Sequence, residues 1–115
     1  MSDTGPDSRQ RDAAESAFEQ AKPSEAQALP KMDFAGFVLS LSHSALIHLG
    51  DAPNPADGRT SVDLAMARHT IDLLALLHDK TQNNLNGEEE HILTQSLYDL
   101  RMRYVDVAKT EGKKT

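Results

Sequence analysis

Cysteine and tryptophan are absent from the 115 residues, and aromatic residues make up only 4% of the chain. Without cysteine there is no disulfide framework, no thiolate nucleophile and no cysteine-ligated zinc. Glycine and proline are also few, at six and five residues. Long runs of β-branched residues are lacking, so no segment has the pattern of a strand. These absences favour an all-α protein.

A concentration of charge of one sign is missing as well. The formal net charge of −6 is spread along the chain, which argues against broad nucleic-acid binding. The longest uncharged stretch, residues 34–50, contains three serines and two histidines and is too short and too polar to cross a membrane. Residues 1–6 carry neither the basic nor the apolar region of a secretory signal. We therefore expect a soluble, cytoplasmic protein without membrane insertion.

Residues 1–31 are expected to form a disordered, acidic N-terminal arm. They contain six acids, four bases and a single aromatic residue, Phe18. This is too little apolar surface to offset the entropy lost on ordering. A few helical turns over residues 12–21 can form because alanine and glutamate favour them, and Pro23 would stop such a helix.

The remainder is predicted to be a helical domain at residues 32–109, followed by a frayed tail at residues 110–115. Capping and turn signals define three helices, at about residues 33–49, 62–81 and 87–109. Asp33 is a good N-cap, and Gly50 is well placed as a left-handed residue after the first helix. Asn86 and Glu89 complete a capping-box pattern at the start of the third.

Apolar residues on the third helix fall on two separate lines. The main line has spacings of 4, 3, 4 and 3 and is predicted to face the core; it consists of Leu93, Leu97, Leu100, Tyr104 and Val107. A second stripe lies roughly opposite on the helical wheel; it consists of Tyr98, Met102 and Val105. Arg101 lies between the two lines.

The first two helices carry broader apolar surfaces. On the second, Arg68, Asp72 and Asp79 share a strip about 40° wide, and most of the remaining circumference is apolar, as in a central helix. The first has an apolar arc of about 200°. Its other side carries Gly36, Ser40 and Ser44, a row that either permits close helix approach or is ordinary polar exposure.

Three helices can bury apolar side chains only in the single core between them, so part of the apolar surface of these helices is expected to stay exposed. An exposed surplus of this kind usually marks a partner surface. We therefore predict that self-association completes the three helices as a helical bundle, with a two-fold dimer favoured. The candidate interaction residues are Gly36, Ser40, Ser44, Tyr98, Arg101, Met102 and Val105.

No pattern supports a metal site or catalysis. His43 and His48 lie about 140° apart on a helix and cannot share a ligand face. Glu88 and His91 have the Glu-x-x-His spacing of di-iron bundles, but the motif occurs once and in a first turn that we expect to be exposed. No nucleophile elbow, phosphate-binding loop or dinucleotide fingerprint is present. We assign no catalytic residue, no metal and no cofactor.

Nucleic-acid binding through Arg101 and Arg103 also has little support. Asp99 precedes Arg103 by four residues and Asp106 follows it by three, so we expect pairing within the helix to neutralise much of this charge. An acidic protein partner for Arg101 is the stronger expectation.

Four runs in the helical domain resemble a known family. They are Phe37 to Gly50, Ile71-Asp-Leu-Leu, Lys80-Thr-Gln-Asn-Asn-Leu85 and Leu97-Tyr-Asp-Leu-Arg-Met-Arg-Tyr-Val105. Together they are similar to the bacterial domain-of-unknown-function 1844 family, short helical proteins with a variable N-terminal arm. The resemblance covers about residues 33–108. It implies a bacterial cytoplasmic protein and carries over no activity and no ligand residues.

Two functions remain open at this point. The first is a non-enzymatic protein-interaction or oligomerisation module, which would self-associate through the first helix or through the stripe on the third. The alternative is a small-ligand or cofactor-binding helical bundle with weak enzymatic activity. It would use Ser40, Ser44 and His48, the polar groups along the otherwise apolar first helix.

Overall fold

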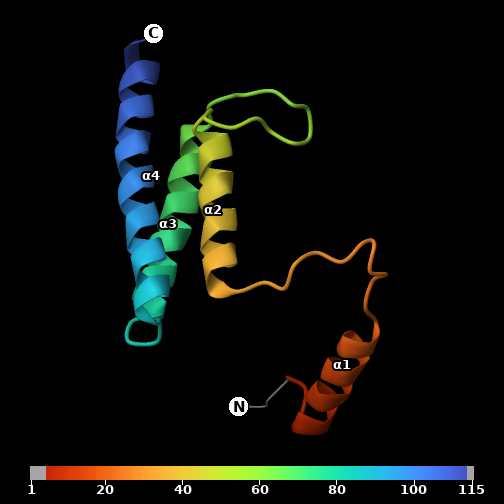
Figure 1. The fold of residues 1–115 in the computed structure, drawn as a ribbon. Helices are drawn as coiled ribbons and strands as arrows, with labels where there is room; N and C mark the ends of the chain where they lie inside the picture. Colours follow the sequence, from red (N-terminus) through yellow and green to blue (C-terminus); the bar gives the residue numbers. More distant parts are fainter. Residues whose placement is uncertain (1–4, 114–115) are drawn as a thin grey trace. The chain divides into compact units, whose positions relative to one another are not determined.

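The computed structural model describes residues 5–113, and the chain divides into two units, residues 1–31 and 32–115. The described residues form four α-helices and no strand, which confirms the all-α prediction. The helices are α1 (Ser8–Gln20), α2 (Phe34–His48), α3 (Leu64–Lys80) and α4 (Gly87–Lys113). The first belongs to the N-terminal unit, and the other three form the second unit (Figure 1).

The described part of the arm contains the helix α1, which begins four residues before the turns expected at residues 12–21. Asp7 explains the earlier start because its side chain accepts a hydrogen bond from the Gln10 amide at 2.9 Å, and the Gln10 side chain accepts one from the Asp7 amide at 2.8 Å. No residue of α1 is buried. A capped helix of this length without packing is marginal on its own, and disorder of the arm stays a prediction.

The three predicted helices of the second unit are confirmed as α2, α3 and α4. Their starts are set by the expected type of cap: Asp33 and Asp63 accept hydrogen bonds from Gly36 and Met66 at 2.7 and 3.1 Å. Asn86 and Glu89 form the predicted capping box, with reciprocal bonds of 2.8 and 3.0 Å.

The helix α4 continues four residues beyond the predicted end at Lys109. No proline or turn pair comes after Lys109, so nothing there stops the backbone hydrogen bonds. The Thr110 hydroxyl also donates to the Asp106 carbonyl at 3.2 Å. Residues 114 and 115 of the predicted tail lie outside the described residues.

A tight turn ends α2, as predicted for Gly50, which has a φ of 81°. The Gly50 amide donates to the Ile47 carbonyl at 3.1 Å, and the Asp51 amide donates to the Leu46 carbonyl at 2.9 Å. Together these two hydrogen bonds form a Schellman motif. It turns the chain into a loop that returns to α3, where the Asp63 amide donates to the His48 carbonyl at 2.7 Å.

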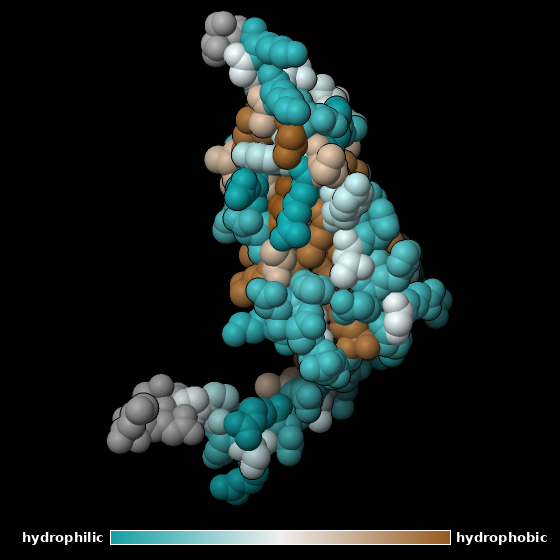
Figure 2. Space-filling view, turned by 90° about the vertical axis from the view of Figure 1, so that its left-hand side faces the viewer, coloured by the Kyte–Doolittle hydropathy of each residue, from teal (hydrophilic) through white to brown (hydrophobic). Residues whose placement is uncertain are grey.

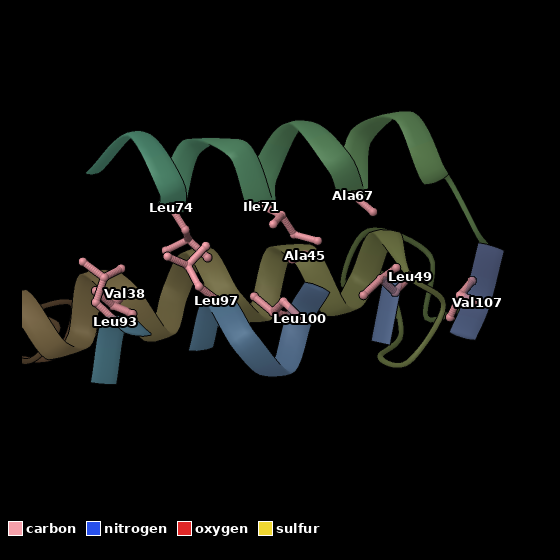
Figure 3. Close-up of a cluster of buried hydrophobic side chains, with 10 residues drawn as sticks. All are labelled: Val38, Ala45, Leu49, Ala67, Ile71, Leu74, Leu93, Leu97, Leu100 and Val107. Carbon is pink, nitrogen blue, oxygen red and sulfur yellow. The ribbon is translucent and has the colours of Figure 1, made fainter. Parts of the chain in front are cut away.

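The core lies between α2, α3 and α4, which pack against one another as a three-helix bundle. Figure 3 shows apolar side chains from all three helices meeting there. The buried apolar residues are Val38, Ala45, Leu49, Ala67, Ile71, Leu74, Leu93, Leu97, Leu100 and Val107. The predicted core line of α4 is therefore confirmed, with Tyr104 packed against it while only partly buried. Among the described helices, none combines the length and the hydropathy that a membrane crossing requires.

Candidate interaction surfaces

The bundle leaves one face of α3 uncovered. Five residues on this face recur at spacings of 3, 4, 3 and 4, and we call them the α3 seam: Met66, His69, Leu73, Leu76 and Lys80. All five are exposed, and the exposed fractions of Met66, Leu73 and Leu76 are 43%, 40% and 54%. Its three apolar members, Met66, Leu73 and Leu76, lie on one line of the helix, and large apolar residues placed in this way normally contact another helix. The sequence identified α3 as apolar nearly all round but did not single out this seam.

The α3 seam borders a groove between α2 and α3. This α2/α3 groove is lined by Phe37, Leu41, Leu73, Leu76, Leu77 and Lys80. Phe37 is 41% exposed, and its neighbours in the groove are apolar apart from the Lys80 ammonium group. The groove and the seam together make one continuous, mostly uncharged face of the bundle.

The predicted second stripe of α4 lies outside the core. Tyr98, Met102 and Val105, which we call the α4 stripe, are 63%, 50% and 44% exposed. Figure 2 looks onto the α4 side of the bundle and shows brown apolar patches set among teal polar side chains. Exposure of the stripe is confirmed, and its role in binding stays a prediction.

Arg101 lies between the core and the α4 stripe, beside α3. It lines two adjoining hollows, one with Arg68, Asp72 and Tyr104 and the other with Ala75, Asp79, Tyr98 and Met102. Arg101 makes no hydrogen bond or ion pair with another described residue. Arg68, by contrast, pairs with Asp72 at 3.8 Å and lies over the Tyr104 ring at 5.6 Å from its centroid.

The row of small residues on α2 is not buried between helices. Ser40 is exposed, whereas Gly36 and Ser44 are half-buried. A Cβ at Gly36 would come 3.0 Å from the Asp33 carboxylate that caps α2. This contact gives Gly36 a local role at the start of the helix, separate from the interaction role predicted for the row.

Arg103 does not pair as the sequence predicts. Its guanidinium donates two hydrogen bonds, of 2.6 and 2.7 Å, to the Asp51 carboxylate, while Asp99 accepts a bond from Gln95 at 3.0 Å. The prediction that Asp99 pairs with Arg103 is therefore wrong, and Asp106 contributes only a smaller electrostatic effect, which raises the pKa of Arg103 less than Asp51 does. The turn after Gly50 presents Asp51 to α4 in the two-pronged geometry that an arginine prefers, and no local spacing encodes that contact.

The ion pair with Arg103 makes stability depend on pH at Asp51. The hydrogen bonds from the Arg103 guanidinium lower the pKa of Asp51 below its ordinary value of 3.8. A carboxyl group whose pKa is lower in the folded protein stabilises the fold fully above its unfolded pKa and loses this effect as the pH falls through the folded pKa. The pair therefore stabilises the bundle at neutral pH.

We expect Arg103→Gln to reduce the free energy of unfolding at pH 7, and we expect this difference to shrink as the pH falls below 3.8. Urea denaturation at several pH values measures both effects. Arg68→Gln is the control, since the Arg68–Asp72 pair is longer and both side chains are about two-thirds exposed. An Arg103→Gln difference that stays constant down to pH 2 would show that the pair does not cause it.

His78 joins α3 to the start of α4. Its Nε2 lies 3.0 Å from a carboxylate oxygen of Glu90, and Gln82 lies within hydrogen-bonding distance of the same ring. The histidine that meets a glutamate is thus His78, across two helices, and not His91 within α4. Among the described residues, no three histidine, aspartate or glutamate side chains are grouped closely enough to hold a metal ion. The contact has a structural role at the α3–α4 turn.

Comparison with known proteins adds one match. The model of the family described as Domain of unknown function (DUF1844) matches residues 31–106, well over half of the chain. The matched segment contains α2, α3 and most of α4, and it leaves out the arm. No curated protein and no solved structure matches the chain.

Proposed function

Because the chain belongs to the DUF1844 family, whose description carries no activity, we propose its function from its surfaces. It acts as a non-enzymatic protein-interaction and oligomerisation module of the bacterial cytoplasm. The apolar faces outside the core are the working surfaces, and Arg101 is a recognition point for an acidic protein partner.

The observation that carries this proposal is the pair of exposed apolar surfaces on a small bundle. The α3 seam with the α2/α3 groove is one, and the α4 stripe is the other. A monomer rarely leaves several large apolar side chains contiguous and exposed unless another molecule covers them. A bundle of this size also gains from association, since its single core is close to the smallest that is sufficient.

Gel filtration with light scattering on the full chain tests the proposal. We expect a mass above that of the monomer which rises with concentration between micromolar and hundreds of micromolar protein. A fluorescent hydrophobic dye should bind the dilute protein and be displaced as the concentration rises. A monomer at every concentration that also fails to bind the dye would refute the proposal.

The small-ligand alternative draws less support from the same surfaces. Ser40 is exposed, and none of the hollows described above is lined by Ser40, Ser44 or His48. Polar groups bind small molecules when they converge on an enclosed apolar pocket. Native mass spectrometry of the protein purified from its own source would revive this alternative if it found a retained small molecule.

A further inference from the structure

We infer that the α3 seam and the α2/α3 groove form a two-fold interface with a second copy of this chain, in which the two α3 helices run antiparallel. The inference rests on the proposed oligomerisation and assigns it to one face. It leaves the α4 stripe and Arg101 open for a different protein.

The first argument is the pattern of the seam. Spacings of 3, 4, 3 and 4 keep Met66, His69, Leu73, Leu76 and Lys80 on one line along α3. This is the repeat with which one helix packs against another as a coiled coil. The line on α4 with the same kind of spacing is buried against α2 and α3. The line on α3 is exposed over its whole length, so a further helix fits it.

The second argument is the distribution of charge, which selects the orientation. In a parallel pair each seam residue would face its own counterpart, so Lys80 would meet Lys80 and His69 would meet His69. In an antiparallel pair whose two-fold axis passes midway between Met66 and Leu76, Met66 faces Leu76 of the second copy and His69 faces Leu73. A lysine in such a seam is a known determinant of register and orientation.

The antiparallel arrangement also gives Lys80 an opposite charge. Lys80 then lies beside the start of the second copy's α3, where Asp63 is exposed as the N-cap. The two-fold axis makes this contact twice, once at each end of the interface. Between these ends, the residues that make up the face include no aspartate, glutamate or arginine. The surface therefore complements itself when one copy is reversed.

The third argument is the area. The helix α3 is about 25 Å long, and two helices side by side are about 20 Å wide, so the face covers about 500 Å² per copy. Two copies would bury roughly 1,000 Å², close to the lower limit of specific interfaces. We therefore expect a concentration-dependent dimer, in contrast to an obligate one.

The test compares two matched substitutions in the full chain, Leu76→Asp in the seam and Met102→Asp in the α4 stripe. The two side chains are similarly exposed, at 54% and 50%, so each variant should fold, which circular dichroism checks. Leu76→Asp places a charge against an apolar surface of the second copy and should weaken the dimer more than about 100-fold. Met102→Asp should leave the dimer unchanged in sedimentation equilibrium.

Single cysteines test the antiparallel orientation, because the chain has no cysteine of its own. A Met66→Cys chain mixed with a Leu76→Cys chain should form the mixed disulfide on mild oxidation. Met66→Cys alone should not form a disulfide with itself, since the two sulfurs would lie about 15 Å apart along antiparallel helices. A parallel pair would give the opposite result.

The outcomes separate this inference from the proposed function. A dimer that survives Leu76→Asp and dissociates with Met102→Asp would overturn the inference while leaving an oligomerisation module in place. Efficient self-linking of Met66→Cys would overturn the antiparallel orientation. A wild-type chain that is monomeric at all concentrations would contradict both the inferred dimer interface and the proposed oligomerisation.

Discussion

Leu100→Asp is expected to unfold the bundle. The Leu100 side chain is 4% exposed and lies on the core line of α4 among apolar side chains of the three packed helices. An aspartate there would be a buried charge without a partner, which costs about 3–5 kcal/mol or more. A single core in a domain of this size supplies only about 3–5 kcal/mol of stability. Far-UV circular dichroism at 25 °C should show loss of most helical signal.

Met102→Asp is the matched control for this experiment. Met102 lies two residues further along α4, is half exposed, and faces away from the core line. Its substitution should change the free energy of unfolding by no more than about 0.5 kcal/mol. Equal loss of stability in the two variants would mean that the assignment of core and surface on α4 is wrong.

Gly50→Ala should produce the second-largest loss of stability. Gly50 has a φ of 81°, in the left-handed region, where a residue with a Cβ costs about 1–2 kcal/mol. Its Cβ would also come 2.9 Å from a methyl carbon of Val62. The Val62 side chain is β-branched and cannot easily rotate away. We expect a total loss of about 2–4 kcal/mol, measured by chemical denaturation of dilute protein.

Gly58 provides the control for the cost of the left-handed backbone conformation alone. Its φ of 70° is also left-handed, but a Cβ there would have open space around it. Gly58→Ala should therefore cost only about 1–2 kcal/mol, and adding Val62→Ala to Gly50→Ala should recover part of the larger loss. If the two glycine variants lose the same amount of stability, the contact with Val62 does not add to the loss in Gly50→Ala.

The local features of this fold follow from the sequence. Asp33, Gly50 and Asn86 begin or end helices through hydrogen bonds to residues within four positions of each. The helix ends can therefore be predicted from neighbouring residues in the sequence. The core line from Leu93 to Val107 is likewise a property of one helix and its period. The α4 stripe could be separated from that line for the same reason.

The features that the sequence did not predict depend on contacts between distant residues. Arg103 pairs with Asp51 because the turn after α2 brings the loop against α4, whereas nearby acids in α4 looked like the natural partners. The α3 seam was hidden because α3 is apolar nearly all round. Helical spacing alone cannot tell which of several apolar faces the neighbouring helices will cover.

The sequence by itself determined that the chain is helical, where its three core helices begin, and that their apolar surface exceeds what they can bury together. These features follow from composition, from helix capping and from the periodicity of apolar residues along each helix, which do not depend on contacts between distant residues. Only the tertiary structure decided that α2 and α4 cover one side of α3 and leave Leu73 and Leu76 exposed. Burial depends on which faces meet, and this is settled by the packing of all three helices at once.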